Sequence, residues 1–367
     1  MGKKRRERKD LYGLMMRAGV LLELAAIVCV ICIGTVTENE KEEKAMRQAN
    51  ADGIWEVLEK HQQGEIVETA SGDYIKWVDF TVPEEAMSKA YQYDVDSYGQ
   101  EIHINWIELL AYAAARQGGD FGNAALKNID DCAAKLLEGE TIENLTEKLK
   151  YYPYYLEAYT AVLGGFVGEY EMEGEKRYGL KAFSPIAAGF YYTDYDDFGA
   201  SRSYGYARPH LGHDMMGQIG TPIIAAESGY VEALGWNQYG GWRIGIRSFD
   251  KKRYYYYAHL RQNYPYVETL KEGDIVSAGD VIGYMGHTGY SKTENVNNIE
   301  TVHLHFGLEL VFDESQKESN NEIWINCYEL TKFLSKNRSE VYKVEGTKEW
   351  KRVTDIKLPE VERANKN

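Results

Sequence analysis

Hydrophobic positions are densest near the start of the chain, where residues 18–36 read AGVLLELAAIVCVICIGTV. This run has a single charge, Glu23. Because about 20 apolar residues span a bilayer as a helix, the run predicts a transmembrane anchor. Residues 1–17 hold seven Lys/Arg and two Asp/Glu, a local charge of +5 (7 − 2), and the positive-inside rule places them in the cytoplasm. A cleaved signal peptide is the alternative.

After the predicted anchor, the chain is first rich in polar residues and then has the hydrophobic periodicity of helices. Residues 37–102 read as a charged stalk and linker, in which alternating apolar residues predict one strand over 74–82. From residue 103, apolar residues recur three and four positions apart, as in WIELLAYAAA. Four such faces predict a small all-α domain over 103–172. We assign this domain no chemistry and expect it to be a spacer or a packing partner for the C-terminal half of the chain, with wall binding or partner docking as the alternative.

The pattern of residues 178–345 predicts an all-β domain. Short apolar runs such as TPIIAAESGYVEAL, WRIGIRSF and GDIVSAGDVIGYMG alternate with glycine-rich turn signals, which is typical of a compact barrel or sandwich. In the run RYYYYAHL, strand alternation predicts that about half of the four tyrosines are core residues. Residues 346–367 form a charged tail that is expected to fray. The fold class is therefore α+β, with a transmembrane helix, a small all-α domain and an all-β domain in that order.

Composition excludes several classes of protein. The 367 residues carry a formal net charge of -15, whereas a nucleic-acid-binding protein needs a basic surface. Four cysteines are too few for a disulfide scaffold of this length. Cys29 and Cys32 lie in the apolar run, where they act as small hydrophobic residues. Cys132 and Cys327 could pair, but nothing in the sequence demands it.

Six of the eight histidines fall in the predicted β domain. Asp214 follows His210 by four positions, and His303 and His305 are two apart. In a strand, residues i and i+2 point to the same face, so both imidazoles can approach one point. A His–Asp–His set with one open position is typical of catalytic zinc. Each motif alone is weak evidence, and their combination in one domain is stronger.

Five segments together resemble the lysostaphin-like (LytM-type) zinc metallopeptidases, in order and in approximate spacing. The resemblance covers residues 178–315. The segments are RPHLGHD at Arg208–Asp214, GTPIIAA at Gly220–Ala226, YAHL at Tyr257–Leu260, GDIVSAGDVIG at Gly273–Gly283 and HLHF at His303–Phe306. The resemblance implies a duplicated-hybrid-motif β-fold and hydrolysis of peptide bonds in bacterial peptidoglycan.

The resemblance also implies roles for five residues. His210, Asp214 and His305 would be the Zn²⁺ ligands, and His259 and His303 the catalytic histidines. No H-E-x-x-H motif is present to supply a glutamate as general base. Proton transfer and stabilisation of the oxyanion therefore fall on the two catalytic histidines, and the sequence does not say which of them is the base.

Other residues near these motifs are weaker candidates or departures from the family pattern. His213 and His287 read as neighbours of the site rather than ligands. Tyr204 and Tyr206 are candidates for the wall of the cleft. Gly307 stands where the family often has an acidic residue, and the loop between Tyr290 and Val302 is longer than is typical. We expect this loop to lie beside the cleft and to affect the choice of substrate rather than metal binding.

The sequence thus predicts a membrane-anchored zinc metalloendopeptidase that hydrolyses stem-peptide or cross-bridge bonds in peptidoglycan. Its cytoplasmic N-terminus and single anchor would place the catalytic domain outside the cell membrane. The alternative is a non-catalytic scaffold or hydrolase activator with the same fold, working with cell-wall, division or sporulation proteins. A lipoyl- or biotinyl-type carrier is disfavoured, because the GDIVSAGDVIG repeat has no lysine to modify.

Overall fold

The computed structural model describes residues 75, 78 and 80–366, apart from 204–206 and 318–321. The chain divides into two compact units, residues 1–73 and 74–367. The predicted anchor at 18–36, its cytoplasmic flank at 1–17 and most of the stalk lie outside the described residues. Within the described part of the chain, none of the helices combines the length and the apolar character needed to cross a membrane.

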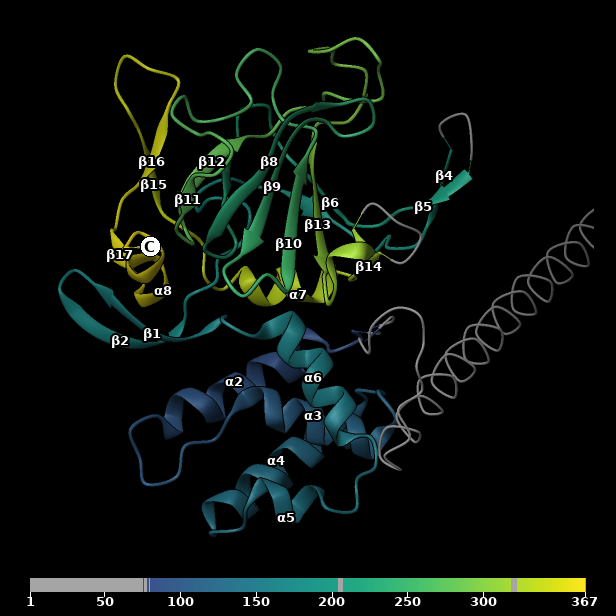
Figure 1. The fold of residues 1–367 in the computed structure, drawn as a ribbon, viewed down its shortest axis with the longest axis vertical. Coiled ribbons are helices and arrows are strands. Elements are labelled where there is room, and N and C mark those ends of the chain that lie inside the picture. Colours follow the sequence, from purple (N-terminus) through teal and green to yellow (C-terminus); the bar gives the residue numbers. More distant parts are fainter. Residues whose placement is uncertain (1–74, 76–77, 79, 204–206, 318–321, 367) are drawn as a thin grey trace, which may run out of the picture. The chain divides into compact units, whose positions relative to one another are not determined.

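The described unit begins with the five helices α2 to α6, which are labelled in Figure 1. Their bounds are α2 Glu84–Ser97, α3 Trp106–Gln117, α4 Asn123–Leu137, α5 Ile142–Thr146 and α6 Tyr152–Leu163. The Asn105 side chain caps the start of α3 by accepting hydrogen bonds from two backbone N–H groups, and Gly118 ends α3 in the left-handed conformation. Helices α3 to α6 fall inside the predicted 103–172 domain, but the all-α prediction is wrong at its end, where Val167–Met172 form strand β1. Helix α2 falls in the predicted linker, because Met87 is the one large apolar residue of a buried face that otherwise holds small and polar residues, including Ala90 and Asp94.

The strand predicted over 74–82 is wrong at its described positions, 75, 78 and 80–82, where the chain is not in a strand. The alternation that suggested it is real, because Val78, Phe80 and Val82 are all buried. Phe80 packs edge-on against the ring of Tyr159 in α6. An irregular segment laid over the helices therefore produces the same pattern as a half-buried strand.

The remainder of the chain is mostly β. The first fourteen strands are β1 Val167–Met172, β2 Glu175–Leu180, β3 Thr193–Asp194, β4 Ser201–Ser203, β5 Ala207–Pro209, β6 His213–Met216, β7 Pro222–Ile224, β8 Gly229–Asn237, β9 Gly241–Ser248, β10 Arg253–Ala258, β11 Ile275–Val276, β12 Val281–Tyr284, β13 His303–Leu310 and β14 Ile323–Trp324. The main sheet has the order β11-β8-β9-β10-β13-β6-β3, and β14 also pairs with β13. Its pairs are antiparallel, and its long strands β8, β9, β10 and β13 run side by side in Figure 1.

Strand alternation separates the two faces of this sheet. Tyr255 and Tyr257 in β10 are fully buried, whereas Tyr254 and Tyr256 line a groove on the opposite face. The prediction that about half of the tyrosine run is core is confirmed. The inner face joins the core, and the other face is free to carry chemistry.

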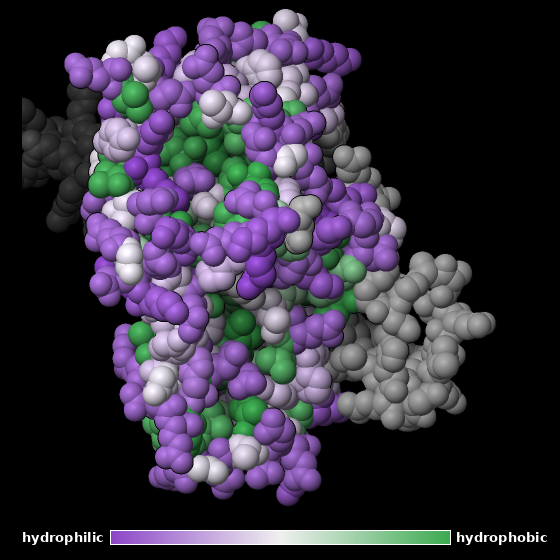
Figure 2. Space-filling view, turned by 60° about the vertical axis from the view of Figure 1, so that its left-hand side comes forward, coloured by the Kyte–Doolittle hydropathy of each residue, from purple (hydrophilic) through white to green (hydrophobic). Residues whose placement is uncertain are grey.

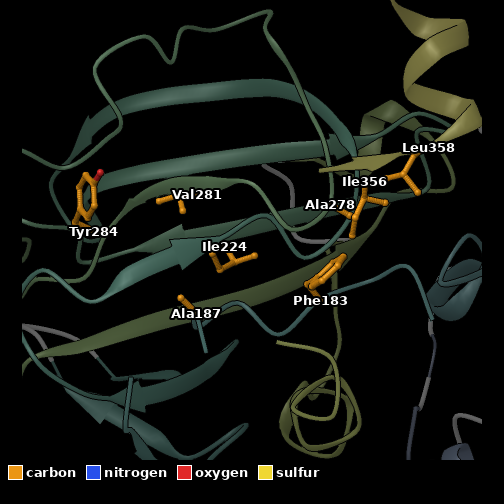
Figure 3. Packing of buried hydrophobic residues seen from close by; sticks show 8 residues of the cluster. All are labelled: Phe183, Ala187, Ile224, Ala278, Val281, Tyr284, Ile356 and Leu358. Carbon is orange, nitrogen blue, oxygen red and sulfur yellow. The ribbon is translucent and has the colours of Figure 1, made fainter. Parts of the chain in front are cut away.

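The C-terminal segment is folded, so the expectation of a frayed tail is wrong. A 3₁₀ turn at Glu314–Gln316 is followed by α7 Tyr328–Leu334, β15 Val341–Lys343, β16 Trp350–Arg352, β17 Ile356–Lys357 and α8 Pro359–Ala364. Ile356 and Leu358 are 7% and 1% exposed and join a buried cluster with Phe183, Ala278 and Val281 (Figure 3). These two apolar side chains anchor a segment whose composition is otherwise charged.

Both described cysteines, Cys132 and Cys327, are buried free thiols, so they do not form the disulfide that the sequence left open. On the face drawn in Figure 2, hydrophilic residues cover most of the surface, and hydrophobic residues are concentrated in the recesses between them.

Candidate active site

The sheet brings the three predicted metal ligands to one point. Asp214 in β6 and His305 in β13 are paired across neighbouring strands, and His210 lies just after β5. The His210 Nε2 and His305 Nδ1 atoms are 3.0 Å apart, and they lie 3.0 Å and 2.9 Å from the Asp214 Oδ1 atom. Among the described residues these three form the group suited to holding a metal ion.

The spacing of the three atoms fits zinc. Zinc–nitrogen bonds of about 2.0–2.1 Å at tetrahedral angles separate ligand atoms by roughly 3.3 Å. Two imidazoles and one carboxylate also leave a fourth position, as catalytic zinc requires. The close approach of His305 depends on Gly212, because a Cβ there would lie 2.5 Å from the His305 ring. The glycine in the RPHLGHD motif thus makes room for the histidine from β13.

Asp197 orients His210 through its backbone carbonyl and places its carboxylate beside the same ring nitrogen. The His210 Nδ1 atom donates to the Asp197 carbonyl oxygen at 3.3 Å and lies 3.1 Å from the Asp197 Oδ1 atom. Its proton is therefore on Nδ1, which leaves the Nε2 lone pair directed at the cluster. Arg202 pairs with Asp197 and donates to the Asp214 Oδ2 atom at 3.0 Å. Each oxygen of Asp214 thus has its own partner.

The two predicted catalytic histidines lie beside this cluster. His259 and His303 have ring centroids 4.8 Å apart, and the His303 Nε2 atom is 3.7 Å from the Asp214 Oδ1 atom. Each donates its Nδ1 proton to a backbone carbonyl, His259 to Thr288 at 2.9 Å and His303 to Thr301 at 2.8 Å. Both Nε2 atoms are therefore free to exchange a proton.

The backbone at His259 is strained. Its φ of 62° is in the left-handed region, which costs a non-glycine residue on the order of 1 kcal/mol or more. Its N–H donates to Gly240 at 2.8 Å, and its carbonyl accepts from Gly286 at 3.1 Å. These bonds hold the strained turn at the end of β10, where it places the imidazole at the site.

Charges in the cluster are strongly coupled. Burial opposes ionisation of Asp214, but hydrogen bonds from His210 and His305 outweigh it and hold the pKa of Asp214 well below its usual range. Burial also lowers the pKa of His259 well below its ordinary value, and the neighbouring His303 and His305 reinforce this. The site thus combines an anionic carboxylate with an imidazole kept neutral.

The other residues that the sequence suggested as neighbours of the site differ in where the structure places them. His213 points away from the cluster and pairs with Asp194 at 3.0 Å, and the His287 Nδ1 atom bonds the Ile299 carbonyl at 2.7 Å. Tyr204 and Tyr206 lie outside the described residues. The loop between Tyr290 and Val302 does border the cleft, to which it contributes Tyr290, Ile299, Glu300 and Thr301. Asp197 was missed, because no motif links it to a histidine 13 residues later.

The departure at Gly307 also has a structural explanation. A Cβ on Gly307 would lie 2.7 Å from the Trp324 ring, so this ring occupies the space where a larger residue would stand. The position is therefore an aromatic part of the cleft rather than an acidic one.

Comparison with known proteins agrees with the fold and the motifs. Residues 208–320 match the model described as peptidase family M23. The L-Ala--D-Glu endopeptidase of Bacillus subtilis is 34% identical over 148 residues, which are 40% of this chain and 43% of that protein. The lysostaphin of Staphylococcus staphylolyticus is 39% identical over 98 residues, which are 26% of this chain and 18% of that protein. The chain thus spans less than half the length of these relatives.

A wider likeness is found among solved structures. A crystal structure at 1.60 Å from Ruminococcus gnavus, of a LytM protein proposed to be a glycyl-glycine endopeptidase, has a TM-score of 0.50 at 23% identity. The alignment covers 77% of this chain and 96% of that one. It therefore extends beyond residues 208–320 and indicates a shared fold.

Proposed function

Because residues 208–320 form a peptidase family M23 domain, we propose that this protein is a zinc-dependent endopeptidase that cuts peptide bonds in bacterial peptidoglycan. The observation that carries the proposal is the convergence of His210, Asp214 and His305 with two further histidines in one groove. A scaffold without activity would not need all five groups.

Zinc would be held by His210, Asp214 and His305. When bound, zinc supplies a Lewis acid that polarises the scissile carbonyl and lowers the pKa of water. The chain's own contribution is the geometry around it. Asp197 fixes the tautomer of His210, and Arg202 holds the second oxygen of Asp214.

Proton transfer would be carried out by His259 and His303. One Nε2 atom accepts the proton of the attacking water, and the other, once protonated, donates to the negative charge that develops on the scissile carbonyl oxygen. The Thr288 and Thr301 carbonyls hold both rings in the required tautomer. This geometry allows either His259 or His303 to be the general base, with the other as the proton donor.

The substrate class rests on the relatives and the groove. The two relatives are named as an L-Ala--D-Glu endopeptidase and a lysostaphin. The groove, of about 1080 Å³, lies at the upper end of the size range of ligand pockets and is large enough to admit an extended peptide. Both a stem-peptide bond and a cross-bridge bond remain candidates.

Location outside the cell membrane is part of the proposal, because peptidoglycan lies there. The apolar run at 18–36 after a +5 flank supports an anchored chain with its N-terminus in the cytoplasm. An Ala45→Cys variant without the native cysteines should be labelled from outside intact cells. A mature protein that starts after Val36 would instead identify a signal peptide.

The function is tested by incubating the full chain with purified sacculi, with and without a chelator. We expect new peptide ends, identified by mass spectrometry, that disappear with the chelator and return with added zinc. His305→Ala should lose both bound zinc and hydrolysis. A wild-type chain that binds zinc and sacculi but releases no peptide would favour the scaffold.

A further inference from the structure

The groove continues well past the histidines along one face of the sheet. His303, His305, Gly307 and Glu309 alternate along β13 and therefore share this face. At about 3.3 Å per residue, Glu309 lies roughly 13 Å from His305 along the strand. Both residues line the same groove, so a peptide bound at the histidines can reach Glu309.

The Glu309 side chain is buried, and one of its two carboxylate oxygens has no partner among the described residues. Its residue is 3% exposed, and its Oε1 atom is buried with no hydrogen-bond partner among the described residues. An unpaired buried carboxylate is costly, because burial removes the water that would stabilise its charge. Burial, followed by the nearby Glu322, raises the pKa of Glu309 to about 7.

The cations nearest to Glu309 form their ion pairs with other carboxylates. Lys317 pairs with Glu232 and lies over the Tyr254 ring. Arg247 pairs with Glu314 through Nη2, while its Nε and Nη1 atoms are buried without a hydrogen-bond partner among the described residues. Neither forms an ion pair with Glu309 in the described part of the chain. The Glu309 carboxylate is therefore available to a cation that comes from outside the protein.

Aromatic residues stand opposite Glu309 on both neighbouring strands. It is opposite Tyr254 on β10 and opposite Trp324 on β14. Rings in this arrangement can pack against the methylene groups of a long side chain and also attract its cationic end. The combination of an unpaired acid with two aromatic walls suits an aliphatic chain that ends in a positive charge.

We propose that Glu309, with Tyr254 and Trp324, forms a subsite for a substrate side chain that ends in a primary ammonium group. This inference rests on the proposed function, since the ligand would be a diamino acid residue of the peptide being cut. An ammonium group would supply the missing hydrogen bonds to Glu309 and restore its charge. Glu309 is thus a specificity residue, distant from the bond that is cut.

The test compares two synthetic peptides that differ by one acetyl group. L-alanyl-γ-D-glutamyl-L-lysyl-D-alanine and its Nε-acetyl-lysyl counterpart are titrated calorimetrically into the full chain carrying His259→Ala, which is expected to keep zinc without turnover. A charge-assisted hydrogen bond should make the free amine bind about tenfold or more tightly. Equal affinity for the two peptides would overturn the proposal.

Glu309→Gln in the same background should reduce the tenfold ratio to within about twofold. Glu138→Gln removes an exposed carboxylate at the end of α4, which does not line the groove, and should leave the ratio unchanged. A ratio that persists in Glu309→Gln would also overturn the proposal. If Glu309→Gln does not fold by circular dichroism, the peptide pair on the His259→Ala chain decides.

The outcomes separate this subsite from the proposed function. Hydrolysis of sacculi by the chain with intact His259, together with equal affinity for the two peptides, would leave the function and remove the subsite. Amine discrimination without any hydrolysis of sacculi would leave the subsite and remove the enzymatic activity.

Discussion

At the scale of single residues, substitutions can distinguish the catalytic histidines, His259 and His303, from the metal ligands. Loss of a catalytic histidine should remove hydrolysis but not zinc. His259→Ala and His303→Ala should each keep about one zinc per chain, because neither belongs to the His210–Asp214–His305 cluster. Hydrolysis of sacculi should fall on the order of 10²–10³-fold in each variant, the usual loss for a proton-transfer or oxyanion-stabilising group.

Metal analysis and release of peptide ends measure the two effects independently. If both histidines act on one tetrahedral intermediate, the double variant should be hardly worse than the more damaged single variant. Activity that survives both substitutions would show that the proton-transfer roles belong to other groups.

Asp197 and Asp194 offer a matched pair of carboxylates, each beside a buried histidine. Asp197 holds His210, whose Nε2 atom belongs to the metal cluster, whereas Asp194 holds His213, which does not. Asp197→Asn keeps the backbone carbonyl that accepts from His210 but removes the negative charge 3.1 Å from its Nδ1 atom, so it should weaken zinc binding about 10-fold. Asp194→Asn should leave it unchanged.

Competition with a chelating dye measures both affinities. Equal zinc binding by the two variants would show that His210 does not depend on Asp197.

The metal ligands and Asp197 also differ in whether they could be predicted from the sequence. The ligands belong to short motifs with fixed strand spacing, but Asp197 is placed by a loop between β3 and β4, for which the sequence has no local signal.

At the scale of elements, strand β10 connects the helical region to the active site. Arg253 starts the strand, and His259 follows its end, roughly 20 Å away at about 3.3 Å per residue. The Arg253 guanidinium makes two bonds to Glu227, of 2.7 and 3.0 Å, and donates to the Ala161 carbonyl near the end of α6 at 2.9 Å. The helices are therefore fastened at the end of β10 that lies far from the histidines.

Arg253→Met should destabilise the protein by about 3–5 kcal/mol, because the largely buried Glu227 would lose its cation and keep only the Tyr255 hydroxyl as a partner. Lys252→Met, one residue earlier on an exposed side chain, should change the free energy of unfolding by less than about 0.5 kcal/mol. Urea unfolding followed by circular dichroism compares the two. Equal midpoints would mean that the Arg253 network contributes little.

Helices and strands with a clear hydrophobic periodicity could be predicted from the sequence. Elements stabilised by contacts with distant residues could not. Helices α3 to α6 have apolar faces, and the long strands have alternating ones. Helix α2 buries Ala86, Ala90, Asp94 and Ser97, which no hydrophobic periodicity reveals. Buried Asp94 is stabilised by groups distant in sequence, among them the Tyr178 hydroxyl at 2.7 Å. Such partners become known only when the fold brings them together.

At the scale of the whole molecule, the C-terminal segment forms hydrogen bonds and ion pairs with several other elements. The Glu349 carboxylate accepts from the Tyr284 hydroxyl at 3.2 Å and from the Glu268 backbone at 3.0 Å. Further along, Lys357 pairs with Glu171 in β1 at 2.5 Å. The charged composition that suggested a frayed tail therefore supplies partners for groups in several other elements.

A chain that ends at Glu345 should consequently be much less stable than the full chain. It loses β16, β17 and α8, and with them Ile356 and Leu358 from the buried cluster of Figure 3. Removing one large buried side chain costs about 2–5 kcal/mol, so losing both should cost more than about 4 kcal/mol. A chain that ends at Ala364 keeps this cluster and should unfold like the full chain. Thermal unfolding at equal zinc occupancy compares the three, and an unchanged midpoint for the chain ending at Glu345 would show that the β domain is complete without its C-terminal segment.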